Sequence, residues 1–200
     1  MNRTNGEAHL LRHIREIEPI SDDEFSALAA RFHATRLPKG GYFTRQDEVC
    51  TRFAFVTSGC LRAFSVNPRG DEYTMYFAFA DWWIGDKTSF YSGTPARFST
   101  QSLEDSELLV CDKAEWECAL AEIPAFERFY RTKVRRSYEA AQQRLIEAHS
   151  ESAEEKYVRL IERSPEIVAR IPQRFIASYL GIQPPSLSRI RRKLARRRIS

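Results

Sequence analysis

The stretch from Ile171 to Ala195, IPQRFIASYLGIQPPSLSRIRRKLA, decides the fold of the C-terminal part of the chain. Its apolar residues are spaced so that two short helices crossing at a steep angle bury them against each other: Ile176, Leu180, Ile182, Leu187 and Ile190. Gly181 follows the first helix, where the chain must turn sharply and a positive φ costs glycine least. Gln183-Pro184-Pro185 then opens a second helix, because proline is tolerated in a first helical turn. The stretch predicts a helix-turn-helix.

The second predicted helix, residues 184–195, carries hydroxyl, amide and guanidinium groups on faces that Leu187 and Ile190 do not use. A small helix with such an outward face suits the major groove of DNA. We expect Arg189, early in this helix, to reach base edges, and Lys193 and Arg196 to lie near phosphates. The candidate DNA-binding residues are Gln173, Gln183, Ser186, Ser188, Arg189, Arg192, Lys193 and Arg196.

Positive charge is concentrated on the same unit. After Glu166 the chain has no acidic residue and nine basic ones, which are Arg170, Arg174, Arg189, Arg191, Arg192, Lys193, Arg196, Arg197 and Arg198. Subtracting these nine charges from the net charge of +4 leaves −5 for residues 1–166. A basic C-terminus can be a solvated tail, and helix-turn-helix geometry also occurs as plain packing. Here the positive charge lies on the predicted helix-turn-helix, whose shape fits the major groove, and this favours double-stranded DNA as the partner.

The composition and the residue spacing argue against a membrane span, a signal peptide and a metal site. A hydrophobic fraction of 42% can form a substantial core, yet charges interrupt the apolar runs too often for a membrane span. The N-terminus resembles a polar arm and an amphipathic helix rather than a signal peptide. His9 and His13 stand four residues apart without a third ligand, so we expect a solvated pair and no metal site. We expect reduced thiols buried in the core of a cytoplasmic protein without a cofactor, from Cys50, Cys60, Cys111 and Cys118.

Between Thr35 and about Asp112 the pattern changes to short runs of near period-two alternation, separated by Gly and Pro turns. This spacing is typical of an antiparallel β-roll or jelly roll, and with the flanking helices it predicts an α+β fold. The expected strands are Tyr42–Arg45, Phe53–Thr57, Leu61–Asn67, Glu72–Phe79, Phe98–Ser102 and Glu107–Cys111. A capping box at Ser21 predicts a helix that runs to about Phe32.

A long helix is predicted from about Ala125 to His149, followed by another from Ala153 to Arg163. The apolar stripe of the long helix recurs at spacings of three and four, close to a coiled-coil seam. The stripe can pack on its own roll, but a second copy of the chain fits better, so we expect a homodimer. The candidate dimerisation residues are Phe126, Tyr130, Val134, Tyr138, Ala141 and Leu145. The expected domains are a roll with N-terminal helices at 1–120, the dimerisation helix at 121–150 and the DNA-binding domain at 151–200.

Six segments resemble the Crp/Fnr family of transcription regulators. They are LPKGGYFTRQDE, FVTSGCLRAF, NPRGDEYTMYF, the Gly85-Asp86 turn, LEDSELLV and, most specifically, IASYLGIQPPSLSRIRRKL. The resemblance covers nearly the whole chain. It implies a sensory β-roll joined by a dimer helix to a DNA-binding helix-turn-helix, with RNA polymerase as a candidate partner.

The chain departs from the family pattern at the effector site. The cyclic-nucleotide-binding members grip the ribose with a Gly-Glu pair and the cyclic phosphate with an Arg-Ser pair. Here the corresponding candidates are Gly85-Asp86, with a shorter carboxylate, and Arg97, which is followed by Phe98 instead of a hydroxyl residue. A cyclic nucleotide, another small ligand and no ligand at all remain open, with cyclic AMP disfavoured. The absence of cysteine before Cys50 also argues against the iron–sulfur cluster of other members.

The recognition helix departs from the family as well. Members that present Glu-x-x-Ser-Arg to the bases have a glutamate where this chain has Pro185, so Ser188 and Arg189 carry over but the target sequence does not. The main hypothesis is a homodimeric, sequence-specific regulator that is not an enzyme. The alternatives are a dimeric nucleoid-type protein that binds DNA without sequence choice and a cupin-like enzyme, which the lack of histidine in the strand region disfavours.

Overall fold

The computed structural model describes residues 4–197, except the side chains of Ala148 and His149. The helices are α1 (Asn5–Arg15), α2 (Asp22–Ala29), α3 (Lys87–Ser92), α4 (Lys113–Glu122), α5 (Pro124–Ser150), α6 (Ala153–Arg163), α7 (Pro165–Arg170), α8 (Gln173–Leu180) and α9 (Pro184–Arg197). The strands are β1 (His33–Leu37), β2 (Tyr42–Thr44), β3 (Arg52–Ser58), β4 (Leu61–Val66), β5 (Glu72–Ala78), β6 (Trp83–Ile84), β7 (Ser99–Ser102) and β8 (Ser106–Asp112).

The strands form a roll of two antiparallel sheets, with the orders β1-β8-β3-β6 and β2-β7-β4-β5. The predicted α+β class with an antiparallel roll is confirmed. The alternation that predicted the strands reflects their facing layers: Ala54, Val56 and Leu61, for example, are buried between the sheets. The sequence did not predict β6, a two-residue strand that pairs with β3, or β1, which pairs with β8 along its whole length.

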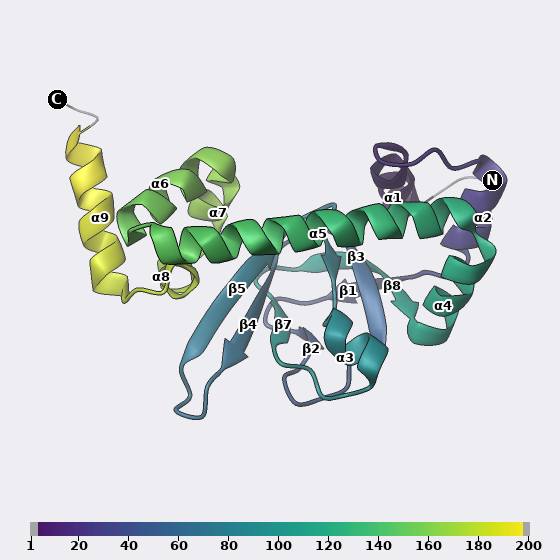
Figure 1. Cartoon of the computed structure of the whole chain (residues 1–200), viewed down its shortest axis with the longest axis horizontal. Helices are drawn as coiled ribbons and strands as arrows, with labels where there is room; N and C mark the ends of the chain where they lie inside the picture. Colours follow the sequence, from purple (N-terminus) through teal and green to yellow (C-terminus); the bar gives the residue numbers. More distant parts are fainter. Residues whose placement is uncertain (1–3, 198–200) are drawn as a thin grey trace.

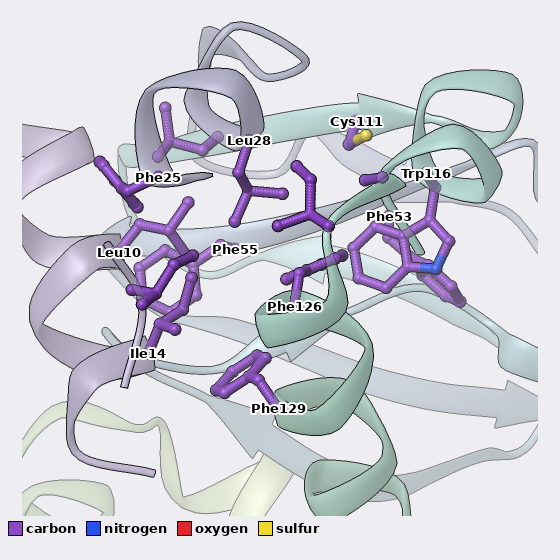
Figure 2. Close-up of a cluster of buried hydrophobic side chains, with 14 of the residues drawn as sticks. Leu10, Ile14, Phe25, Leu28, Phe53, Phe55, Cys111, Trp116, Phe126 and Phe129 are labelled. Carbon is purple, nitrogen blue, oxygen red and sulfur yellow. The ribbon is translucent and has the colours of Figure 1, made fainter. Parts of the chain in front are cut away.

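The largest hydrophobic core lies between the β1-β8-β3-β6 sheet and the helices α1, α2, α4 and α5. Figure 2 shows Phe53 and Phe55 of β3 facing Trp116 of α4 and Phe126 and Phe129 of α5. Aromatic rings dominate this core, and the edge-to-face packing of Trp116 on Phe126, with centroids 5.1 Å apart, is a favourable geometry. The start of α5 is therefore fixed to the roll.

The 27-residue helix α5 connects the two ends of the molecule. Pro124 occupies its first turn, where a missing N–H costs nothing. Figure 1 shows α5 running along the roll, from the α4 end to the end where α6 to α9 gather. The predicted helix from Ala125 to His149 is confirmed to within one residue at each end. The predicted helix from Ala153 is confirmed too, with a capping box formed by Ser152 and Glu155.

The C-terminal helices dock on the roll through a shared apolar cluster that includes Phe77 and Phe79 of the β5 region and Phe175 of α8. Helix α8 lies against β5, which is the edge strand of its sheet. Ser178 bonds this edge directly: its Oγ donates to the carbonyl of Glu72 at 2.7 Å and accepts the N–H of Thr74 at 2.9 Å. A side chain of α8 thus satisfies backbone groups that an edge strand leaves unpaired.

Two expectations about single residues need correction. Cys50, Cys60 and Cys111 are buried free thiols, as expected, but Cys118 is exposed because it lies on the outer face of α4. His13 is not solvated: it is buried between the rings of Phe55 and Phe129. Within residues 4–197, no helix is both long and apolar enough to cross a membrane.

Candidate DNA-binding surface and adjacent cavity

The helix-turn-helix is built by α8, a three-residue turn and α9. Gly181 ends α8 in the left-handed conformation with φ of 70°, as its position predicts. The N–H of Ile182 donates to the carbonyl of Ala177 at 3.0 Å, which satisfies one of the carbonyls at the helix end. Ala177 itself is fully buried. The turn therefore fixes the angle at which α9 leaves α8.

Helix α9 has one apolar face and one basic face. Leu187 is fully buried, and Ile190 and Leu194 pack against the same cluster. The residues at the opposite face follow spacings of three and four and are exposed: Pro185, Arg189, Arg192 and Arg196. Because the apolar face is used for packing, the cationic face is the one that a groove of DNA can meet.

The predicted DNA-binding residues are exposed on this unit, apart from Ser186, which is half-buried. Arg189 donates from Nη2 to Ser186 Oγ at 3.1 Å, a contact that holds its guanidinium over the start of α9. Lys193 forms an ion pair within the protein, because its Nζ lies 2.6 Å from Glu154 Oε2 of α6. A phosphate would have to share Lys193 with this carboxylate. Arg198, the last of the nine basic residues, lies outside the described residues.

The middle of α5 presents an unpartnered apolar stripe. The side chains of Val134, Tyr138 and Leu145 are 39%, 63% and 61% exposed, and Ala141 between them is also exposed. Their spacing of four and seven places them on one face of the helix, as in a coiled-coil seam. Within the described residues this face is exposed, and its role in dimerisation stays a prediction.

The predicted role in dimerisation is wrong for the first two residues of the seam, Phe126 and Tyr130. Phe126 is fully buried in the core beside Phe129 (Figure 2), so it cannot contact a second copy. Tyr130 packs against the same core, and its hydroxyl accepts a hydrogen bond from Tyr91 at 2.9 Å. The stripe is continuous along α5, but its first turns pack on their own roll.

A cavity of about 470 Å³ lies between the roll and α5. Gly85 and Asp86, the two residues of the predicted ligand-binding turn, line it. Asp86 is buried, and both of its oxygens are engaged: Oδ1 accepts the N–H of Ser89 at 3.2 Å, and Oδ2 accepts the N–H of Arg97 at 3.0 Å. Gly85 has φ of 133°, and a Cβ there would overlap the ring of Phe53. The hydrogen bonds of Asp86 and the close packing of Phe53 on Gly85 therefore hold this turn in place.

The structure does not bring the predicted ligand-binding residues together in one site. The side chain of Arg97 is exposed and is not among the residues that line the cavity. Its backbone N–H binds Asp86, and this contact leaves the guanidinium on the outside of the roll. Sequence reasoning missed the basic residues that do line the cavity, which are Lys87, Lys133, Arg136 and Arg144. The spacing of the last three on one face of α5 was the signal available.

Within the part of the chain that the structure describes, no group of three or more His, Cys, Asp or Glu residues could hold a metal ion.

The comparisons with known proteins agree with this architecture. Residues 34–122 match the family model of the cyclic nucleotide-binding domain. No curated protein sequence is significantly similar to the chain. Among solved structures, FixK2 from Bradyrhizobium japonicum superimposes with a TM-score of 0.68 at 16% identity, over 83% of this chain and 85% of that chain.

Two further structures are similar over most of their length. The global regulator CLP of Xanthomonas campestris, described as responsive to c-di-GMP, has a TM-score of 0.69 at 11% identity, over 88% of this chain and 92% of that chain. A protein assigned to the Crp/Fnr family of transcriptional regulators, from Eubacterium rectale, has a TM-score of 0.69 at 14% identity, over 88% of this chain and 84% of that chain. The chain therefore shares the fold of these three proteins, and its residues 34–122 match the model of the cyclic nucleotide-binding domain.

Proposed function

We propose that the protein is a homodimeric transcription regulator that binds a specific DNA site. The observation that carries this proposal is the basic outer face of α9, which lies opposite the buried Leu187 on a helix set by the Gly181 turn. A helix of this size and charge fits the major groove. The similar structures support the proposal, since CLP is named as a global regulator that acts on gene expression.

The residues on α9 divide by their place along the helix. Arg189 is exposed in the first half of α9, where guanine O6 and N7 are the acceptors that a guanidinium binds best. Ser188 and Gln183 are exposed beside it and supply neutral donors and acceptors. Arg192, Lys193 and Arg196 lie further along the helix and contact phosphates, while Gln173 contacts the backbone from the start of α8.

The second copy of the chain binds through the exposed stripe of Val134, Tyr138, Ala141 and Leu145 on α5. A two-fold dimer places two copies of α9 on one side of the DNA. The site is then a pseudo-palindrome whose half-sites are about one helical turn, ~34 Å, apart. RNA polymerase is a further partner of the bound dimer in this proposal.

A dimeric DNA-binding protein without sequence choice is the alternative. Such a protein relies on phosphate contacts alone, and its binding is set by charge and salt. The exposed Gln183 and Ser188 favour sequence reading, because neutral polar side chains on the groove face add little to a purely ionic contact.

Nuclease protection of the DNA upstream of the protein's own gene tests the proposal. Sequence-specific binding predicts one or a few protected sites, each with two-fold symmetry, at protein concentrations that leave the flanking DNA open. Uniform protection that rises with concentration along the whole fragment would instead favour the nucleoid-type alternative.

A further inference from the structure

One carboxylate of α6 contacts the basic helix α9. Glu154, in the first turn of α6, pairs with two residues of α9 at once: its Oε2 lies 2.6 Å from Lys193 Nζ, and its Oε1 lies 3.1 Å from Arg197 Nη1. After Glu166 the chain has no acidic residue, so no side chain of the helix-turn-helix itself can supply this negative charge. The charge comes from α6 and engages both oxygens of one carboxylate.

The two paired cations lie at the border between the two faces of α9. At 100° per residue, Lys193 and Arg197 follow Arg189 of the basic face by about 40° and 80°, in the direction of the packed Leu194. Side chains at the flank of a helix that enters a groove are close to the phosphates along its edge. The side chains of Lys193 and Arg197 are 53% and 64% exposed, so a phosphate can reach them. Glu154 therefore holds its carboxylate where a phosphate would bind.

The fold keeps Glu154 in this position. Its side chain is only 26% exposed, whereas its two partners are mostly exposed. The neighbouring Glu155 forms the capping box with Ser152, so the backbone of this turn is fixed without any contribution from Glu154. Arg159 of the same helix pairs with Glu147 of α5 at 2.6 Å, which ties α6 to the end of α5, next to α9 (Figure 1). The carboxylate is thus presented to α9 by a rigid element.

The ion pairs of Glu154 are nevertheless open to competition. Glu154 and Arg197 line an open cleft of about 450 Å³ between α6 and α9, and exposed ion pairs of this kind contribute little stability. A phosphate and a carboxylate carry like charge, so they repel each other when both approach Lys193. DNA that binds α9 must either displace Glu154 or meet two cations that are already partly neutralised. Both outcomes reduce the free energy gained from the phosphates.

We propose that Glu154 lowers the affinity of the protein for DNA by competing with phosphates for Lys193 and Arg197. The competition acts on the phosphate contacts, which every DNA sequence offers, so it reduces the affinity for any duplex and has its largest effect at low salt. This inference rests on the proposed DNA-binding function and adds to it a residue outside the helix-turn-helix that sets the affinity.

Glu154→Gln tests the proposal, because glutamine keeps the shape of the side chain and removes its charge. The anisotropy of a fluorescently labelled duplex of random sequence, titrated with the full-length protein at about 50–200 mM salt, measures the affinity and its salt dependence. We expect the variant to bind at least about threefold more tightly at ~50 mM salt, because one phosphate contact changes the affinity by about that factor over this range of salt. The slope of log affinity against log salt should become steeper by about one per protomer.

Glu162→Gln is the matched control for the change in net charge. Glu162 is exposed on the same helix, about 12 Å further along its axis, and its substitution removes the same charge from the protein. We expect this variant to keep the wild-type slope against salt. If Glu162→Gln instead gains as much affinity as Glu154→Gln, net charge explains the effect and the proposal is overturned.

A double-mutant cycle shows whether Lys193 and Arg197 carry the effect. Replacing both with glutamine should cancel the affinity gained by Glu154→Gln, and it should weaken wild-type protein less than it weakens the Glu154→Gln variant. Equal affinity and slope of Glu154→Gln and wild type would overturn the proposal. Weaker binding by Glu154→Gln would overturn it too, because Glu154 would then position the two cations for DNA. A failure of the proposed function is distinguishable from these results, since wild type and all variants would then bind no duplex at all.

Discussion

The guanidinium carbon of Arg62 lies 3.9 Å from the centroid of the Phe175 ring, so a buried arginine of the roll packs directly on the first helix of the helix-turn-helix. The same guanidinium lies 3.8 Å from the ring of Phe64 on its own strand. Its Nη1 donates to Glu72 Oε2 at 2.6 Å. Together with Ser178 on the edge of β5, this stack fixes the orientation of α8 relative to the roll.

Replacing Arg62 with Met should therefore destabilise the protein as a whole. The change keeps an apolar stem between the two rings but removes the charged hydrogen bond to Glu72, which is worth about 1–3 kcal/mol. Urea unfolding measures the loss as a lower midpoint. Arg69→Met, on the exposed turn of the β4–β5 hairpin, is the control and should stay within about 0.5 kcal/mol of wild type. Equal midpoints for the two variants would show that the stack does not hold the domains together.

Val134→Asp should separate the proposed dimer. The substitution places a charge in the middle of the exposed stripe of α5, where the partner helix would exclude water. Sedimentation should then move towards the 23.2 kDa of one chain, with weaker binding to DNA. Ile146→Asp is a matched control, because Ile146 is as exposed as Leu145 but lies on another face of α5. A wild-type protein that sediments as a monomer at micromolar concentration would rule out the seam.

Cyclic AMP should have little effect on DNA binding. Asp86 is held by the N–H groups of Ser89 and Arg97, and the guanidinium of Arg97 lies outside the cavity. We expect saturating cyclic AMP to change the affinity for the specific site by less than about 1 kcal/mol, below the usual range of allosteric coupling. Calorimetry provides the direct check, and micromolar binding of cyclic AMP would contradict the expectation.

Stability should fall between pH 6.5 and 4 because of His13. Burial, reinforced by the charge of Lys133, lowers the pKa of His13 from its ordinary 6.5 to about 4. The unfolded chain therefore binds a proton in this window that the folded protein does not, so the folded state loses stability as the pH decreases. The full shift corresponds to about 3 kcal/mol. His13→Phe keeps a ring between Phe55 and Phe129 and should remove this pH-dependent loss of stability. Urea unfolding of the wild-type and variant proteins at a series of pH values measures the loss as the difference between their two stability profiles. Parallel profiles would show that His13 is not the group responsible.

The sequence predicted the long elements better than the short ones. Helix α5 and the Gly181 turn depend on local signals, a stripe of regular period and a residue that tolerates φ of 70°. In contrast, α7 has six residues and β6 has two, and β6 exists because Ala54 and Phe55 pair with it across the sheet. Such pairing is not visible in a window of the sequence.

The errors at the candidate sites have the same origin. Phe126 and Val134 belong to one periodic stripe, and only the packed fold shows that the first faces its own core and the second faces outward. Likewise, Lys87 and Lys133 are far apart in the chain, and only the packed fold places both at the wall of one cavity. Periodicity identifies a face of a helix, but it does not identify what that face contacts.

The most direct test of the account is competition binding of wild-type and Arg189→Ala protein to specific and random duplexes at several salt concentrations. We predict that Arg189→Ala loses about 1–3 kcal/mol per protomer on the specific site and little on random DNA, because a base contact is removed. Lys193→Ala, as the comparison, should weaken both duplexes alike and reduce the slope of log affinity against log salt by about one or less, since Glu154 already pairs with Lys193. If Arg189→Ala lowers the affinity for both duplexes by the same factor, α9 does not read sequence through Arg189 and the claim of specific recognition fails.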